Sequence, residues 1–75
     1  MKKFPRITFS AAVMGGQACI RGMRIPVSVV LNLLAHGMNG AAILKEYPDL
    51  EKEDIQECLD YASWLAKDEL HLTEV

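Results

Sequence analysis

The first 45 residues contain no acidic side chain, although the chain of 75 residues carries ten acids. All ten lie in residues 46–75, where only Lys52 and Lys67 oppose them, so the two parts have formal charges of +6 and −8. This asymmetry indicates one face for an anionic partner and another that avoids it. The cations of the first part are Lys2, Lys3, Arg6, Arg21, Arg24 and Lys45.

Other absences exclude whole classes of protein. No apolar run approaches the roughly 18 residues that a membrane-spanning helix needs, and the start MKKFPRITF lacks the apolar core of a signal peptide. Cys19 and Cys58 have no metal-binding or redox spacing, which predicts free thiols in a cytoplasmic protein. No repeat or linker interrupts the chain, so we expect one domain over residues 1–75. A hydrophobic content of 51% in so short a chain favours a homodimer.

Nothing in the sequence favours an enzyme or a cofactor site. The carboxylates of Asp49, Glu51, Glu53 and Asp54 gather where a helix is expected to start, and acids stabilise that end of a helix without any catalytic role. His36 and His71 are far apart in the sequence, so we predict no metal site. No nucleophile has an evident base beside it. We therefore expect a non-catalytic protein without a cofactor.

The first third of the chain predicts short strands and turns. Residues 6–9 (RITF) alternate polar and apolar side chains with β-branched residues, which is typical of a strand. The paired glycines of residues 13–17 predict a loop. Residues 19–20 and 24–25 flank Gly22, which can supply the positive φ of a tight hairpin turn.

Helical signals follow the hairpin. Pro26 suits a first helical turn, and Gly37 followed by Met38 predicts a left-handed helix stop, so the first helix covers about residues 27–36. Asn39 is a suitable N-cap for a second helix over about 40–46, which ends before Pro48. A third helix is expected over about 52–68. The tail LHLTEV could be a strand or a segment that orders on a partner.

The sequence resembles a known family at this level of detail. The motifs Gly15-Gly16, Ile20-Arg21-Gly22 and Arg24-Ile25-Pro26-Val27, followed by a Gly-based helix stop and by Tyr47-Pro48-x-Leu50 with Asp54-Ile55, are similar to the signature of the small bacterial proteins called domain of unknown function 433. Three positions depart from that signature. Ala18 replaces a proline, Met23 a threonine, and Glu51 a helix-capping Thr or Ser.

The resemblance implies an antitoxin-like protein of the VapB type. The implied fold is mainly α, with a short N-terminal strand and β-hairpin (about 6–26) before a three-helix homeodomain-like or winged helix-turn-helix core. The implied function is that of a type II toxin–antitoxin system, in which a dimer binds a PIN-like ribonuclease toxin and operator DNA. The alternative is a protein-interaction or oligomerisation module that does not bind DNA.

The charges decide which residues could contact DNA. A recognition helix over 52–68 would bring five acids towards phosphate, which costs affinity. We therefore predict contacts from the N-terminal arm (Lys2, Lys3, Arg6), the hairpin (Arg21, Arg24) and Lys45. Alternatively, Arg21 or Arg24 forms ion pairs with acids of the third helix, or contacts the toxin. Ile20, Ile25 and Trp64 are the candidates for an oligomer interface.

Overall fold

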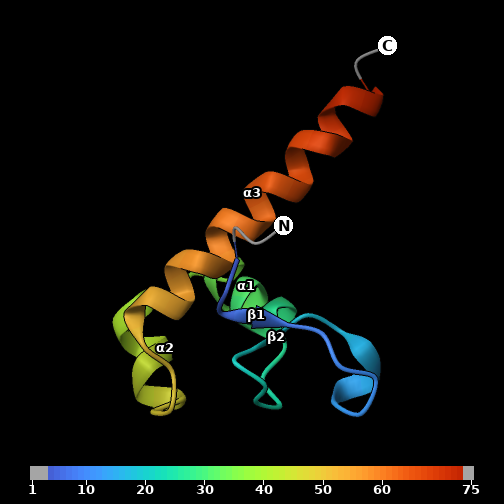
Figure 1. Ribbon diagram of the computed structural model, residues 1–75. Coiled ribbons are helices and arrows are strands. Elements are labelled where there is room, and N and C mark those ends of the chain that lie inside the picture. Colours follow the sequence, from blue (N-terminus) through green and yellow to red (C-terminus); the bar gives the residue numbers. More distant parts are fainter. Residues whose placement is uncertain (1–3, 74–75) are drawn as a thin grey trace.

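The chain forms a two-stranded sheet packed beside three helices, and the structure, a computed structural model, describes the backbone of residues 4–73 and the side chains of residues 4–67 (Figure 1). The predicted fold class, mainly α with a short N-terminal antiparallel strand pair and three helices, is confirmed. In chain order the elements are β1 (Ile7–Thr8), the 3₁₀ turn η1 (Met14–Gly16), β2 (Cys19–Ile20), α1 (Val27–Ala35), α2 (Gly40–Glu46) and α3 (Lys52–Thr73).

The sheet pairs the N-terminal strand with the first arm of the predicted hairpin. β1 and β2 are antiparallel, with Ile7 opposite Ile20 and Thr8 opposite Cys19. The second arm, residues 24–25, does not form a regular strand, but an isolated antiparallel bridge pairs Cys19 with Pro26. The N–H of Ile20 donates to the carbonyl of Ile25 at 3.1 Å, and the N–H of Val27 donates to the carbonyl of Ala18 at 2.9 Å. The extended arm ends there because α1 begins at the next residue, Val27.

The hairpin turn itself forms as the sequence predicts. The backbone N–H of Met23 donates to the carbonyl of Ile20 at 2.8 Å, which closes a four-residue turn around Arg21 and Gly22. Gly22 has a φ of +74°, as expected. Arg21 also has a positive φ, +45°, which a residue with a Cβ rarely adopts. Positive φ at both central residues is typical of the type I′ turn that joins short antiparallel arms.

The corners between helices follow their capping signals. The side chain of Asn39 accepts a hydrogen bond from the N–H of Ala42 at 2.9 Å, which confirms it as the N-cap of α2. At the end of α1, Gly37 has a φ of +95°. The N–H of Met38 donates to the carbonyl of Leu33, and the N–H of Gly37 donates to that of Leu34, both at 3.0 Å. These two bonds form a Schellman motif, so α1 turns sharply towards α2.

α3 is longer than predicted and extends away from the other elements (Figure 1). It runs to Thr73, so residues 70–73 of the tail are helical and the strand prediction is wrong for them; residues 74–75 lie outside the described part. A helix satisfies its backbone hydrogen bonds within one segment, whereas a strand needs a neighbour to pair with. The predicted helix end at residue 68 was therefore five residues too early.

The core lies where the sheet and the first half of α3 meet α1 and α2. Each strand and helix contributes to it, and the corner before α3 adds Leu50. Leu50 and Ile55 occupy the N′ and N4 positions of α3, where paired apolar side chains form a hydrophobic staple. The buried apolar residues are Ile7, Cys19, Ile20, Val27, Val30, Ile43, Leu50, Ile55 and Cys58. Because no buried apolar residue of the described side chains lies beyond Cys58, the projecting half of α3 is not part of this core.

Candidate functional site: a buried aspartate, two arginines and an exposed aromatic patch

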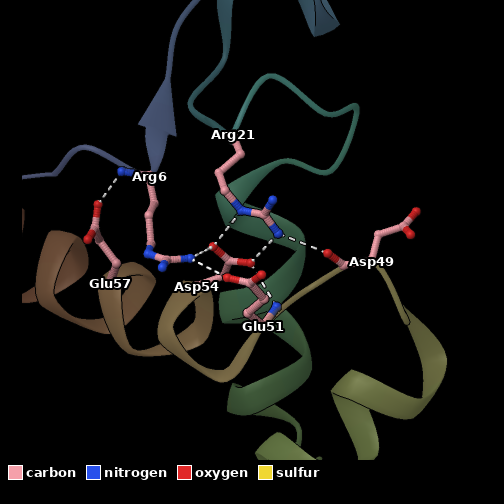
Figure 2. A network of polar contacts seen from close by, with 6 residues as sticks. All are labelled: Arg6, Arg21, Asp49, Glu51, Asp54 and Glu57. Carbon is pink, nitrogen blue, oxygen red and sulfur yellow. Dashed lines mark hydrogen bonds and ion pairs between the residues drawn. The ribbon is translucent and has the colours of Figure 1, made fainter.

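Asp54 is the centre of a polar network at the start of α3 (Figure 2). It is the third residue of the helix and only 1% exposed. Its Oδ1 accepts hydrogen bonds from Nη1 of Arg6 at 2.8 Å and from Nε of Arg21 at 3.0 Å. Its Oδ2 accepts from Nη2 of Arg21 and from the backbone N–H of Glu51, both at 2.8 Å. Both oxygens of this buried carboxylate are therefore fully engaged, as a buried charge requires.

The β1–β2 pair is what places the two arginines side by side. The N–H of Arg21 donates to the carbonyl of Arg6 at 2.8 Å, so both side chains leave the same end of the sheet and reach Asp54 (Figure 2). The left-handed backbone of Arg21 directs its guanidinium at the carboxylate in a bidentate pair. Backbone strain at a non-glycine residue persists where the surroundings hold it, and here the bidentate pair does so.

Further bonds extend the network to neighbouring segments. Nη2 of Arg21 donates to the carbonyl of Asp49 at 2.9 Å, and Nη1 of Arg6 donates to the carboxylate of Glu51 at 2.9 Å. The backbone N–H of Arg6 donates to Oε2 of Glu57 at 2.6 Å. The network therefore ties the N-terminal strand, the hairpin turn, the corner between α2 and α3, and the first two turns of α3 into one unit.

The electrostatics of the network follow from burial and pairing. Burial opposes the charge of Asp54, but hydrogen bonds from Arg21, from the backbone of Glu51 and from Arg6 outweigh it and lower the pKa of Asp54 to about 2. Hydrogen bonds to Glu51 and Asp54 raise the pKa of Arg6, and the bond to Asp54 raises the pKa of Arg21. Asp54 and the two arginines therefore stay charged at neutral pH, which suits a structural clamp rather than proton transfer.

Two of the acids at the start of α3, Glu51 and Asp54, thus have a structural task. Asp54 also caps the helix, because it accepts from the N–H of Glu51, the residue that precedes the first turn. This is the second half of a capping box. The side chain of Glu51 pairs with Arg6 instead of capping. Where the family signature has a Thr or Ser that caps the helix, Glu51 therefore forms an ion pair with Arg6, just before β1.

The predicted DNA-contacting residues divide into three groups. Arg6 and Arg21 are ion-paired with Asp54, so the alternative of an ion pair with the third helix is confirmed for Arg21. Arg24 and Lys45 are exposed and form no ion pair with any residue in the described part of the chain. Lys2 and Lys3 lie outside the described residues. The sequence grouped the three arginines as DNA contacts, but in the structure Arg6 and Arg21 pair with Asp54 whereas Arg24 stays exposed.

The predicted interface residues also differ in their surroundings. Ile20 is 1% exposed and packs in the core of the single chain, so its side chain offers no surface to a second copy. This corrects its assignment to an interface: β1 and the helices already cover it. Ile25 is half-buried against the core. Trp64 is 41% exposed and lies on α3.

Trp64 belongs to a group of aromatic side chains that sequence reasoning missed. We call Phe4, Phe9, Tyr61 and Trp64 the aromatic patch. Phe4 contacts Tyr61 edge to face, with ring centroids 5.4 Å apart, and lies 5.6 Å from Trp64. Tyr61 lies 6.2 Å from Trp64 and 6.4 Å from Phe9. The spacing of Tyr61 and Trp64 on one helix could have signalled half of the patch, but nothing local places Phe4 and Phe9 against α3.

The described residues offer no centre for metal chemistry. Among them, no three His, Cys, Asp or Glu side chains gather in a way that could hold a metal ion. Nδ1 of His36 lies 2.8 Å from the carbonyl of Asn32 in the preceding turn of α1. Both cysteine thiols are buried and unpaired, and burial raises the pKa of the Cys58 thiol to about 12. No helix in the described part is long and apolar enough to cross a membrane.

Comparison with known proteins places these features in a family. Residues 7–62 match the family described as Protein of unknown function (DUF433). The chain is also similar to a solved structure, that of a DUF433 member protein from Anabaena variabilis, with a TM-score of 0.76 and 32% sequence identity. That similarity covers 84% of this chain and 62% of the other, so the chain spans less than two thirds of that protein's length. No curated protein matches.

Proposed function

We propose that this chain, which belongs to the DUF433 family, is a non-catalytic antitoxin-like protein that acts in the cytoplasm by binding a partner protein. The partner is the PIN-like ribonuclease toxin of a type II toxin–antitoxin system. The observation that carries the proposal is the projecting half of α3, where Trp64 and Leu65 are 41% and 44% exposed. Phe4 lies beside Trp64, but no other helix or strand of the described residues packs against this half (Figure 1). Exposed apolar side chains gathered on one helix are typical of an interaction site.

The polar network supports binding to protein rather than to nucleic acid. Arg6 and Arg21 both form ion pairs with Asp54. Releasing either one to bind phosphate would leave a buried carboxylate short of a partner, which is costly. The described part of α3 is itself acidic and would be repelled by DNA. The bonds within the network also leave Asp54 no free lone pair for catalysis.

α3 can also hold a second copy of the chain, on a different face from the one that carries Trp64. Leu59 is 43% exposed and lies five residues before Trp64 on α3. At 3.6 residues per turn, the two side chains are about 140° apart around the helix axis. α3 therefore presents two separate apolar faces, and we assign the face of Leu59 to a second copy. Sedimentation equilibrium tests this: Leu59→Ser is expected to weaken a dimer, and a monomer at all concentrations would exclude one.

Co-expression with a PIN-like nuclease encoded beside this chain tests the main proposal. We expect the two proteins to co-purify and the chain to restore growth that the nuclease alone arrests. The double substitution Trp64→Ala and Leu65→Ala is expected to abolish both effects while the far-ultraviolet dichroism stays unchanged. Glu46→Gln on α2, an exposed residue away from α3, is the matched control. Continued growth arrest with the folded wild-type chain present would contradict the proposal.

Operator DNA is a second candidate because two cations stay available. Arg24 and Lys45 are exposed and lack ion pairs among the described residues, and both precede the acidic part of the chain. If they contact phosphate, Arg24→Ala with Lys45→Ala lowers the slope of log affinity against log salt by about two. A gel-shift salt series with the chain's own promoter region measures that slope. If the chain does not bind its promoter at low salt, even with the toxin present, the DNA-binding role is excluded and only the protein-binding role remains.

A further inference from the structure

The aromatic patch is the largest exposed group of ring side chains in the molecule. It contains four of the chain's five aromatic residues, and two of them are strongly exposed, Phe9 at 58% and Trp64 at 41%. Its rings come from the N-terminal arm and from α3, and the four centroid distances of 5.4–6.4 Å hold them as one surface. Rigid, partly exposed aromatic side chains are the residues that most often dominate binding energy at interfaces.

Carboxylates run along α3 beside this patch. We call Glu53, Glu57 and Asp60 the carboxylate row. They are spaced by four and three residues, and Trp64 follows four residues later, so all four side chains share one face of the helix. The first three turns of α3 carry the row, and the fourth carries the tryptophan.

The carboxylates of the row accept hydrogen bonds only from neutral donors in the described part of the chain. Glu57 accepts from the backbone N–H of Arg6, and Asp60 accepts from the amide of Gln56 at 3.1 Å, and both donors are neutral. No cation among the described residues lies within ion-pair distance of any of the three carboxylates. The charges of Arg6 and Arg21 are balanced by Glu51 and Asp54 in the neighbouring network. These four charges cancel, whereas no cation of the described residues offsets the three carboxylates of the row, Glu57 included.

We infer that the aromatic patch and the carboxylate row together dock a cationic, amphipathic segment of a partner protein. Apolar side chains of that segment cover Tyr61 and Trp64, while its Lys or Arg side chains lie along the row. Where the row ends at Trp64, a Lys or Arg side chain of the segment also contacts the face of the indole ring in a cation–π interaction. A second copy of this chain fits this face poorly, because it would bring one carboxylate row towards another. The inference rests on the proposed function only for the partner being a protein, and it adds the chemistry of that partner.

The single tryptophan of the chain makes the docking measurable. The probe is a synthetic helical peptide of about 15 residues with leucines on one face and lysines and arginines beside them. We expect a saturable blue shift of Trp64 emission that weakens with added salt. A peptide of the same pattern with glutamates in place of the cations should give no shift. Glu53→Gln with Asp60→Asn should weaken binding about tenfold, since two charges at the rim of the interface are lost.

The controls separate this surface from others. Glu46→Gln with Asp49→Asn removes two exposed charges that precede α3 and lie outside the carboxylate row, and it should leave the peptide affinity unchanged. It keeps the backbone carbonyl of Asp49, which is the only part of this residue that bonds to Arg21 in the polar network. Equal binding of the cationic and acidic peptides, or equal losses in the two double variants, would overturn the inference. So would a red shift of Trp64 emission on dilution that follows the dissociation of a dimer in sedimentation, because the patch would then be covered by a second copy.

The outcomes also distinguish this inference from the proposed function. If the adjacent nuclease binds the chain but the cationic peptide does not compete with it, and Glu53→Gln with Asp60→Asn has no effect on the complex, then the toxin binds elsewhere and the inference fails alone. If the peptide binds as expected and the nuclease does not bind, the surface is correct and the proposed partner is wrong.

Discussion

Replacing Asp54 with asparagine tests whether the polar network holds the fold together. The substitution preserves the shape of the side chain and one acceptor oxygen, so the backbone N–H of Glu51 can still be capped. What it removes is the negative charge that pairs with two guanidinium groups. The expected result is a large loss of folding free energy without a change of fold.

The magnitude follows from the carboxylate's burial and pKa. Its pKa falls from 3.8 to about 2 on folding, and each pKa unit corresponds to about 1.36 kcal/mol, so the ionised form contributes about 2.5 kcal/mol. Breaking a fully buried pair costs about 3–5 kcal/mol. The arginine side chains are 30% and 34% exposed, so water partly solvates them and the loss falls below that range. We expect about 2–3 kcal/mol, against a total of about 4–11 kcal/mol for a domain of this size.

Urea unfolding followed by Trp64 fluorescence and by circular dichroism measures this loss as a lower midpoint at an unchanged slope. Glu51→Gln is the matched control, because its side chain is 56% exposed and also pairs with Arg6, and it should cost at most about 1 kcal/mol. Equal losses for Asp54→Asn and Glu51→Gln would refute the reasoning, since the burial of Asp54 would then have no energetic consequence.

Two further predictions concern acid stability and the corner after α1. Because folding lowers the pKa of Asp54, the stabilisation that its carboxylate gives is complete above about pH 4 and is lost as the pH falls towards 2. Acid titration of the folded fraction should therefore show a decline in this range that the Asp54→Asn variant lacks. A parallel decline in both proteins would contradict this. Gly37→Ala should lower stability by about 1 kcal/mol in thermal or urea unfolding, through backbone strain alone, since φ is +95° and no atom lies within 4 Å of the added Cβ. Gly40→Ala, at a helical position with only an ordinary contact to Ile55, is its control and should not destabilise; equal losses at both glycines would argue against strain as the cause.

Local sequence signals predicted the helices and their corners well. Asn39 caps α2, Gly37 and Met38 end α1, and Gly22 permits the hairpin turn, as their residue types indicate. Each of these effects acts within a few residues, so the sequence contains both partners of the interaction. The end of α3 was predicted less well, because alternation over a few residues at a chain end does not distinguish a helix from a strand.

The sites depended on contacts between residues far apart in the chain. Arg21 and Asp54 are separated by 33 residues, and Arg6 and Asp54 by 48. The charge asymmetry showed that an ion pair between the basic residues 1–45 and the acidic residues 46–75 was possible. It did not show whether Arg21 or Arg24 would form that pair. The positive φ of Arg21 decided that choice, and a non-glycine residue gives no sequence signal for it. The aromatic patch was missed for the same reason, because Phe4 reaches Tyr61 only once β1 has paired with β2.

Residue type and spacing alone determined the family, the order of the elements and the excess of acids in the second part of the chain. Tertiary structure decided what those acids do. Asp54 became a buried, neutralised clamp, because the sheet carries Arg6 and Arg21 to it. Glu53, Glu57 and Asp60, on the same helix, have no ion-pair partner, because no cation of the described residues reaches them. Pairing between charges depends on distances of a few ångströms, and only the packed chain sets those distances.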